Sequence, residues 1–158
     1  MAPLRWNLRR PRRFSRLDGG RRALLMEAVV LLAAARIAVH LVPFRMLARR
    51  LGRFVRPQDE ACILARMNSS TSQADLAREI GWAVTRAARH APFEAVCLPQ
   101  AIAAQIMLRR RGVASVMHFG AAPGKTDQLD AHAWLDAAGV EVTGYPVEQH
   151  LAEIACIV

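Results

Sequence analysis

The sequence is short of cysteine, of acidic residues in its first third and of long uninterrupted apolar runs. Its three cysteines, Cys62, Cys97 and Cys156, stand at no metal-ligand spacing, and any disulfide would leave one of them over. This pattern favours a reduced, cytosolic compartment and predicts no metal and no other cofactor. The sequence also lacks a glycine-rich phosphate loop and a pair of catalytic carboxylates, so nucleotide chemistry is not expected.

Charge divides the 158-residue chain into two unequal parts. Residues 1–56 contain 14 arginines and two acidic residues, a net charge of +12, whereas residues 57–158 contain eight basic and 11 acidic residues, a net charge of −3. We therefore predict a basic N-terminal arm with a helical extension over 1–56 and the main domain over 57–158. Eight arginines fall in the first 22 residues. They form either a solvated tail or a contact for an acidic partner, anionic lipid or nonspecific nucleic acid.

Residues 23–42 are strongly apolar, but charge interrupts them. Glu27, Arg36 and His40 leave 28–35 as the longest stretch free of charged residues and histidine. A membrane span needs about 20 predominantly apolar residues, and the basic arm is long for the start of a signal peptide. We expect a buried or interfacial helix in a cytoplasmic protein, with peripheral membrane contact left open.

Hydrophobic spacing predicts helices first and strands afterwards. Residues 146–158 are expected to form a short helix or an irregular segment that closes the sheet. The predicted class is α+β, with a helix packed on a small antiparallel sheet. The predicted helices cover 23–42, 44–51, 58–67, 73–89 and 97–111, and the predicted strands cover 113–120, 129–136 and 140–143.

Cys97 and His132 are the candidate catalytic residues. Cys97 lies at the start of an apolar helix, where unpaired backbone N–H groups and the helix dipole stabilise a thiolate. His132 lies 35 residues later in a predicted strand, and a histidine near a cysteine is the usual base for the thiol proton. Cys62 and Cys156 are interpreted as packing residues. His118 is a weaker candidate for the base, or a residue that lines the cleft.

A third residue is needed to orient the imidazole. Asp136 lies four residues from His132 on the same strand, about 13 Å away, too far for direct contact. Across a two-residue hairpin at 137–138, His132 would face Thr143, with Glu141 on the diagonal. Glu141 is therefore the tentative orienting acid, although it is equally well explained as a solvent-facing strand charge.

Several motifs of the chain occur together in one known family. They are Val96-Cys97-Leu98-Pro99-Gln100-Ala101, Met107-Leu108-Arg109-Arg110-Arg111-Gly112, His118-Phe119-Gly120, Ala131-His132-Ala133-Trp134, and Trp82 with Arg86 and Arg89. Together they resemble the motifs of the leader peptidases of lasso-peptide biosynthesis. These are transglutaminase-like B proteins, related to the C-terminal half of the microcin-processing B protein. The resemblance extends over nearly the whole chain, including the Arg-rich start and the residues Arg49-Arg50-Leu51-Gly52.

This resemblance implies a papain-like cysteine peptidase fold and mechanism. Cys97 would attack the bond between leader and core, and His132 would move the proton. The family often carries an aspartate about a dozen residues after the histidine, where this chain has Thr143-Gly144. The implied partners are the precursor peptide, a small leader-recognition protein and an ATP-dependent cyclase. The recognition protein is expected to act in trans, because residues 1–56 are too short and too helical for such a module.

Two other functions remain open from the sequence. A transglutaminase or amidase would use the same cysteine and histidine but pass the acyl group to an amine instead of water. A noncatalytic protein that binds membrane surfaces or nucleic acid through the Arg-rich arm would bind with strong salt dependence and would keep its function without Cys97.

Overall fold

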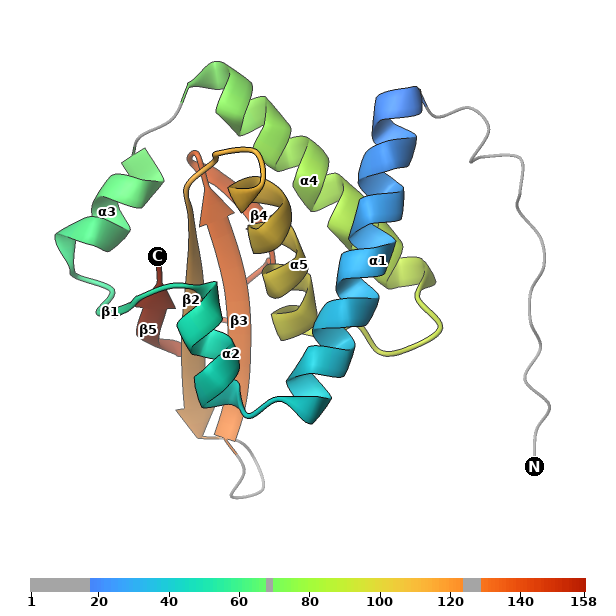
Figure 1. The fold of residues 1–158 in the computed structure, drawn as a ribbon. Helices are drawn as coiled ribbons and strands as arrows, with labels where there is room; N and C mark the ends of the chain where they lie inside the picture. The colour runs from blue at the N-terminus through green and yellow to red at the C-terminus, as the bar shows by residue number, and fades with distance from the viewer. Residues whose placement is uncertain (1–17, 68–69, 124–128) are drawn as a thin grey trace, which may run out of the picture.

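Residues 18–67, 70–123 and 129–158 are described by the computed structural model, in which helices pack against an antiparallel five-stranded sheet (Figure 1). The strand order is β1-β5-β2-β3-β4. This arrangement confirms the predicted α+β class. In chain order the elements are α1 (Gly19–Leu41), α2 (Phe44–Leu51), β1 (Phe54–Val55), α3 (Glu60–Met67), α4 (Thr71–His90), α5 (Cys97–Arg109), β2 (Ser115–Pro123), β3 (Leu129–Ala137), β4 (Val140–Thr143) and β5 (Ala152–Ile157).

Helix α1 shares one hydrophobic core with α4, α5 and the sheet. Asp18 caps its start by accepting a hydrogen bond from the Gly20 N–H at 3.0 Å. Its buried residues keep a spacing of three and four, as at Leu25, Ala28 and Leu32. By length and composition α1 could cross a membrane, with a mean hydropathy of 2.0. The face that carries its buried residues, however, packs inside the protein. The division after residue 56 rests on charge and composition, and it stays a prediction.

Helix α4 begins at Thr71, directly after a side-chain cap. Ser70 and Gln73 form a capping box, in which each side chain accepts a hydrogen bond from the other residue's backbone N–H. Gly81 in the middle of α4 lies against β4, where an added Cβ would lie 2.6 Å from the Val142 carbonyl oxygen. This close approach holds α4 directly on the edge of the sheet.

Glu27 connects α1 to the end of α5. Its carboxylate contacts Arg111 at 2.7 Å and Arg110 at 3.1 Å. The hydrogen bond from Arg111 lowers the pKa of Glu27, the Arg110 bond and both positive charges lower it further, and partial burial opposes them. The two ion pairs therefore stabilise the fold while Glu27 is ionised.

We expect Glu27→Gln to lower the free energy of unfolding by about 1 kcal/mol at pH 7, because the arginines are partly exposed. A lowered pKa in the folded state gives stability that is present above the unfolded value, about 4.3, and that disappears as the pH falls through the folded value. Urea unfolding at pH 7 and at pH 3 measures the difference, which should be smaller at pH 3. Asp75→Asn, which removes an exposed pair within α4, is the matched control and should change little. An equal loss for Glu27→Gln at both pH values would contradict this role.

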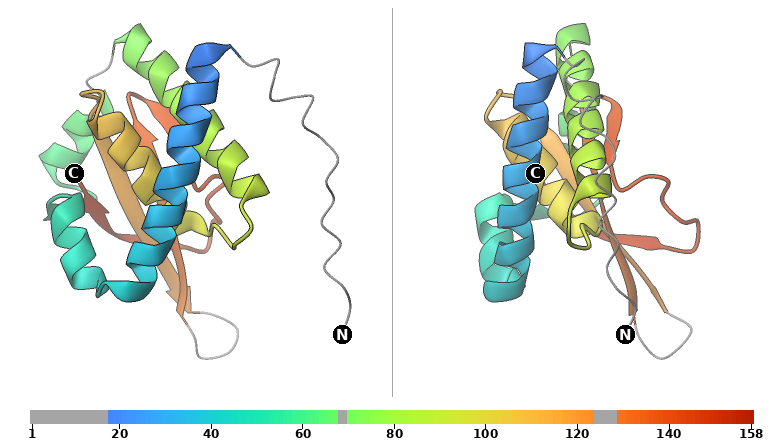
Figure 2. Two further views of the ribbon diagram at one scale, coloured as in Figure 1. Left: turned by 45° about the vertical axis from the view of Figure 1, so that its right-hand side comes forward. Right: turned by 90° about the vertical axis from the view of Figure 1, so that its right-hand side faces the viewer.

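The two faces of β3 have different surroundings. Leu135 and Ala137 lie in the core formed with the helices, whereas His132, Trp134 and Asp136 alternate with them and point to the opposite face. Figure 2 shows α1, α4 and α5 on one side of the sheet and the chain between β4 and β5 on the other. The sheet therefore separates the apolar core from a second, more polar layer.

The prediction of a short helix or irregular segment is wrong for residues 152–157. These residues form β5, an internal strand between β1 and β2. A register shift between Phe119 and Gly120 pairs them with Ala155 and Glu153, so that Ile154 is left out of the ladder. This bulge removes the alternation that would have indicated a strand.

Candidate active site

Cys97 is the first residue of α5, and it is partly buried. The preceding residue, Val96, is extended and 48% exposed, and it provides no side-chain cap. The side-chain amide of Gln100 donates a hydrogen bond to the Ala95 carbonyl at 2.6 Å, which fixes the loop ahead of the cysteine. Pro99 fits the first turn, where its missing N–H costs nothing. The predicted position of Cys97 at a helix start is confirmed.

His132 lies on β3, half-buried, and its ring is held by the backbone. Its Nε2 lies 2.6 Å from the carbonyl oxygen of Gly144. A carbonyl oxygen can only accept a hydrogen bond, so Nε2 carries the proton and donates. In the neutral ring, Nδ1 is then left with its lone pair, which is what a general base requires.

Gly144 occupies its position because no other residue fits there without strain. It follows β4 with a φ of +85°, and an added Cβ would lie 2.8 Å from the Trp134 Cβ and 2.5 Å from the Ala133 carbonyl oxygen. The chain therefore crosses close over β3 at this point. This crossing places the Gly144 carbonyl at the His132 ring, 12 residues along the chain.

We expect Gly144→Ala to destabilise the protein by about 2–4 kcal/mol, because it combines a strained φ with a backbone clash. Gly139→Ala is the matched control, since Gly139 also has a positive φ, +73°, but nothing lies within 4 Å of its added Cβ. Urea unfolding of both variants separates the clash from the strain. Equal losses in the two variants would show that the crossing over β3 does not constrain this position.

Cys97 and His132 are not hydrogen-bonded to each other in the part of the chain that the structure describes. Helix α5 packs against β3, but the His132 side chain is on the strand face opposite to the one that the helices cover. The ladder between β3 and β4 covers only Leu135 to Ala137 on the β3 side. At His132, β3 is therefore not paired with β4. The edge of β3 at this point lies between the helices and the imidazole.

The register that suggested Glu141 as the orienting acid is wrong. The turn is at Ala138–Gly139, one residue later than predicted, and a bulge follows it, so Glu141 pairs with Asp136. His132 lies four residues away along β3, about 13 Å. Glu141 instead lines a cavity of about 380 Å³ together with Trp82 and other residues of α4.

We expect Glu141→Gln to leave the rate of the proposed reaction within about twofold of the wild type, because a solvent-facing strand charge has little effect. The measurement is the turnover of a peptide substrate by both proteins side by side. A loss of a hundredfold or more, with unchanged stability, would restore Glu141 as the orienting residue.

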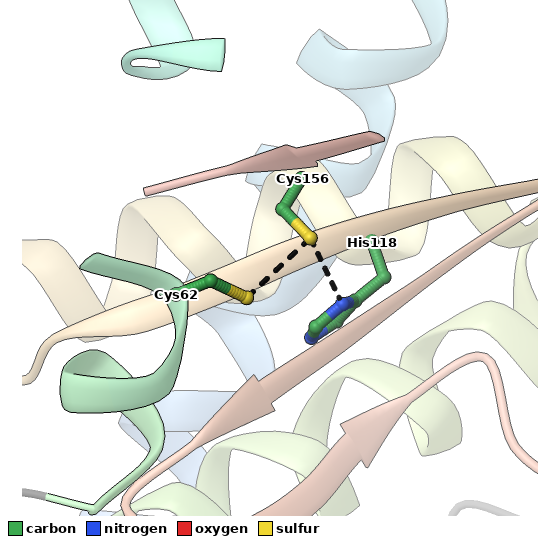
Figure 3. A group of neighbouring side chains, drawn as sticks. All are labelled: Cys62, His118 and Cys156. Atoms are coloured by element: carbon green, nitrogen blue, oxygen red, sulfur yellow. Dashed lines mark hydrogen bonds between the residues drawn. The ribbon is translucent and has the colours of Figure 1, made fainter. Parts of the chain in front are cut away.

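A second group of cysteine and histidine side chains lies in the polar layer (Figure 3). His118 is fully buried and stacks on Trp134, with ring centroids 5.4 Å apart. Its Nδ1 lies 3.4 Å from the Cys156 Sγ, which lies 3.5 Å from the Cys62 Sγ. Sequence spacing gave no sign of this group, because α3, β2 and β5 bring its members together from distant positions.

This buried group is poorly suited to nucleophilic catalysis. Burial raises the pKa of the Cys156 thiol, and hydrogen bonds to Glu153 and Cys62 raise it further. A protonated, buried thiol is a poor nucleophile. The hypothesis that His118 lines a cleft is wrong, since the side chain has no exposed surface.

The profile described as the Transglutaminase-like superfamily matches residues 38–156, most of the chain. The chain belongs to the transglutaminase-like superfamily. This superfamily includes cysteine peptidases and acyl transferases. Comparison with curated proteins and with solved structures found no match.

Proposed function

We propose that this transglutaminase-like protein is a cysteine peptidase that removes the leader from a ribosomally made lasso-peptide precursor before the macrolactam forms. The observation that carries the proposal is the hydrogen bond from His132 to the Gly144 carbonyl, which fixes the tautomer that a base for Cys97 needs. Superfamily membership and the motifs around Cys97 and His132 support it.

In the proposed reaction, Nδ1 of His132 takes the proton of the Cys97 thiol, and the thiolate attacks the carbonyl carbon of the bond between leader and core. The first turn of α5 stabilises the oxyanion. Pro99 has no N–H and the Gln100 N–H bonds to Val96, so the N–H groups of Cys97 and Leu98 are the remaining donors of this turn. The imidazolium protonates the leaving amine, and water then hydrolyses the thioester.

The meeting of the two catalytic groups depends on the edge of β3. The start of α5 lies on the helix side of the sheet, and the imidazole lies on the other side. Cys97 and His132 can therefore approach each other only around the edge of β3, beyond its last pair with β4 at Leu135. Hydrogen bonds of catalytic groups are often long without substrate and shorten in the complex. We propose that movement at this edge lets the two groups meet in the free protein and that the bound peptide then holds them together.

The proposal includes partners in trans. A small leader-recognition protein holds the precursor, and an ATP-dependent cyclase acts next, with the chain in the bacterial cytoplasm or at the membrane surface. The proposal does not include specific binding of nucleic acid. Helix α1 provides an apolar surface for such contacts, because several of its large side chains are exposed: Met26, Val29, Val30, Ile37 and Leu41.

The test is mass spectrometry of a cognate precursor incubated with this protein and its recognition partner in water enriched in ¹⁸O. Hydrolysis predicts a leader fragment that carries ¹⁸O at its new carboxyl terminus, formed by the wild type and absent with Cys97→Ala. An acyl transferase instead predicts a product joined to an amine, without the label. An intact precursor with an active partner present would contradict both reactions.

A further inference from the structure

Four potential metal ligands that the proposed reaction does not use converge in the polar layer. Cys62 comes from α3, His118 from β2, and Glu153 and Cys156 from β5. The two cysteines and the histidine are each no more than 1% exposed, and their ligand atoms all lie within 4.8 Å of one another. Figure 3 shows Cys62, His118 and Cys156 pointing toward one another.

The bulge in β5 is what brings Glu153 and Cys156 to the same face. Residues three apart on a regular strand point to opposite faces. The register shift that leaves out Ile154 changes this parity, and the Glu153 carboxylate lies 3.0 Å from the Cys156 Sγ and contacts Nδ1 of His118. Ile154 itself is 62% exposed. The bulge thus adds a carboxylate to the two thiols and the imidazole.

The spacing of these atoms resembles that of a tetrahedral zinc site. With Zn–S bonds of about 2.3 Å and Zn–N bonds of about 2.0–2.1 Å, neighbouring ligand atoms lie about 3.5–3.8 Å apart. The two sulfur atoms are 3.5 Å apart, and the Cys156 sulfur is 3.4 Å from Nδ1 of His118. The Glu153 carboxylate lies closer to the Cys156 sulfur and to Nδ1 of His118, so it would have to move back to take the fourth position.

The surroundings of His118 also match those of a metal-bound imidazole. Its Nε2 faces the Asp136 carboxylate at 3.3 Å, and the Tyr145 hydroxyl donates to the same carboxylate. In a metal-bound site, an Asp136 carboxylate that accepts from Nε2 would leave the lone pair of Nδ1 for the ion, and this arrangement typically accompanies histidine ligands of zinc. Electron-pair donors from three elements therefore point at one place.

We propose that Cys62, His118, Cys156 and Glu153 bind a zinc ion, with Asp136 orienting His118. Two thiolates with one imidazole and one carboxylate favour Zn²⁺ over Mg²⁺ or Ca²⁺, which prefer oxygen ligands. Four protein ligands in a buried setting form a closed, structural site. The ion joins α3 to the face of the sheet that lies opposite the helix core. The site is distinct from Cys97 and His132, and its test does not depend on peptidase activity.

The test is Co²⁺ binding to the reduced, chelator-treated full-length chain, followed by absorption spectroscopy. Thiolate-to-cobalt charge-transfer bands with strong tetrahedral d–d bands are expected, and excess Zn²⁺ should remove them. Cys62→Ser should halve the charge-transfer intensity per cobalt and weaken binding by about tenfold or more. Asp136→Asn should keep the intensity but weaken binding by about 10- to 100-fold.

Cys97→Ser is the matched control, because it removes a thiol outside the proposed site, and its spectrum should equal that of the wild type. Circular dichroism checks that each variant is folded. The proposal is overturned if the folded, reduced wild type shows no charge-transfer band, or if Cys97→Ser lowers the band as much as Cys62→Ser. It is also overturned if peptide mapping of the purified protein shows a disulfide between Cys62 and Cys156.

Discussion

Replacing Cys97 with alanine is expected to lower the rate of leader cleavage by about 10⁴-fold or more, because no other group can form the thioester. The other two cysteines do not substitute for it. Cys62 and Cys156 are buried on the far side of the sheet, and burial raises the pKa of the Cys156 thiol. The measurement is the initial rate of product formation by mass spectrometry.

The same variant should fold normally. Cys97 is only partly buried, and alanine favours the first turn of a helix at least as well as cysteine. Val96→Ala is the control for a disturbance of the helix start, since Val96 is the exposed neighbour, and its rate should stay within about threefold of the wild type. Turnover by Cys97→Ala within tenfold of the wild type would remove the proposed nucleophile.

Replacing His132 with glutamine should lower the rate by about 10²- to 10⁴-fold, the usual contribution of a positioned acid–base group. Glutamine can still donate a hydrogen bond to the Gly144 carbonyl, so the crossing over β3 is kept while the base is lost. The reaction progress curves of the variant and the wild type at equal concentration provide the measurement.

His150→Gln is the matched control for His132. His132 and His150 both line a cavity of about 280 Å³, and the His150 side chain is 51% exposed. Its replacement should change the rate by less than about threefold. If His150→Gln proved as damaging as His132→Gln, the cavity and not the catalytic base would explain the loss.

The helices could be predicted because their signals are local. Apolar spacing, the cap at Ser70 and the proline after α1 are properties of neighbouring residues, and the structure confirms the helices that they indicate. Strand β5 could not be predicted, because its bulge hides the alternation and its partners, β1 and β2, lie far away in the sequence. A one-residue error in the turn at Ala138–Gly139 was enough to misplace Glu141.

The candidate site shows the same limit. Cys97 and His132 were proposed from residue type, setting and the resemblance, and their catalytic role stays a prediction. The acceptor for His132 is a backbone carbonyl, and no side-chain pattern could have identified it. The group of Cys62, His118, Glu153 and Cys156 depends on three distant elements and one bulge, so sequence spacing could not reveal it.

The most direct test of the central claim, that Cys97 and His132 act as a pair, needs neither precursor nor partner. It is the rate of Cys97 alkylation by iodoacetamide at neutral pH, read by peptide mass mapping in the wild type and in His132→Gln. A thiolate maintained by the imidazole predicts alkylation about tenfold or more slower in the variant. Equal alkylation rates in the two folded proteins would contradict the pairing.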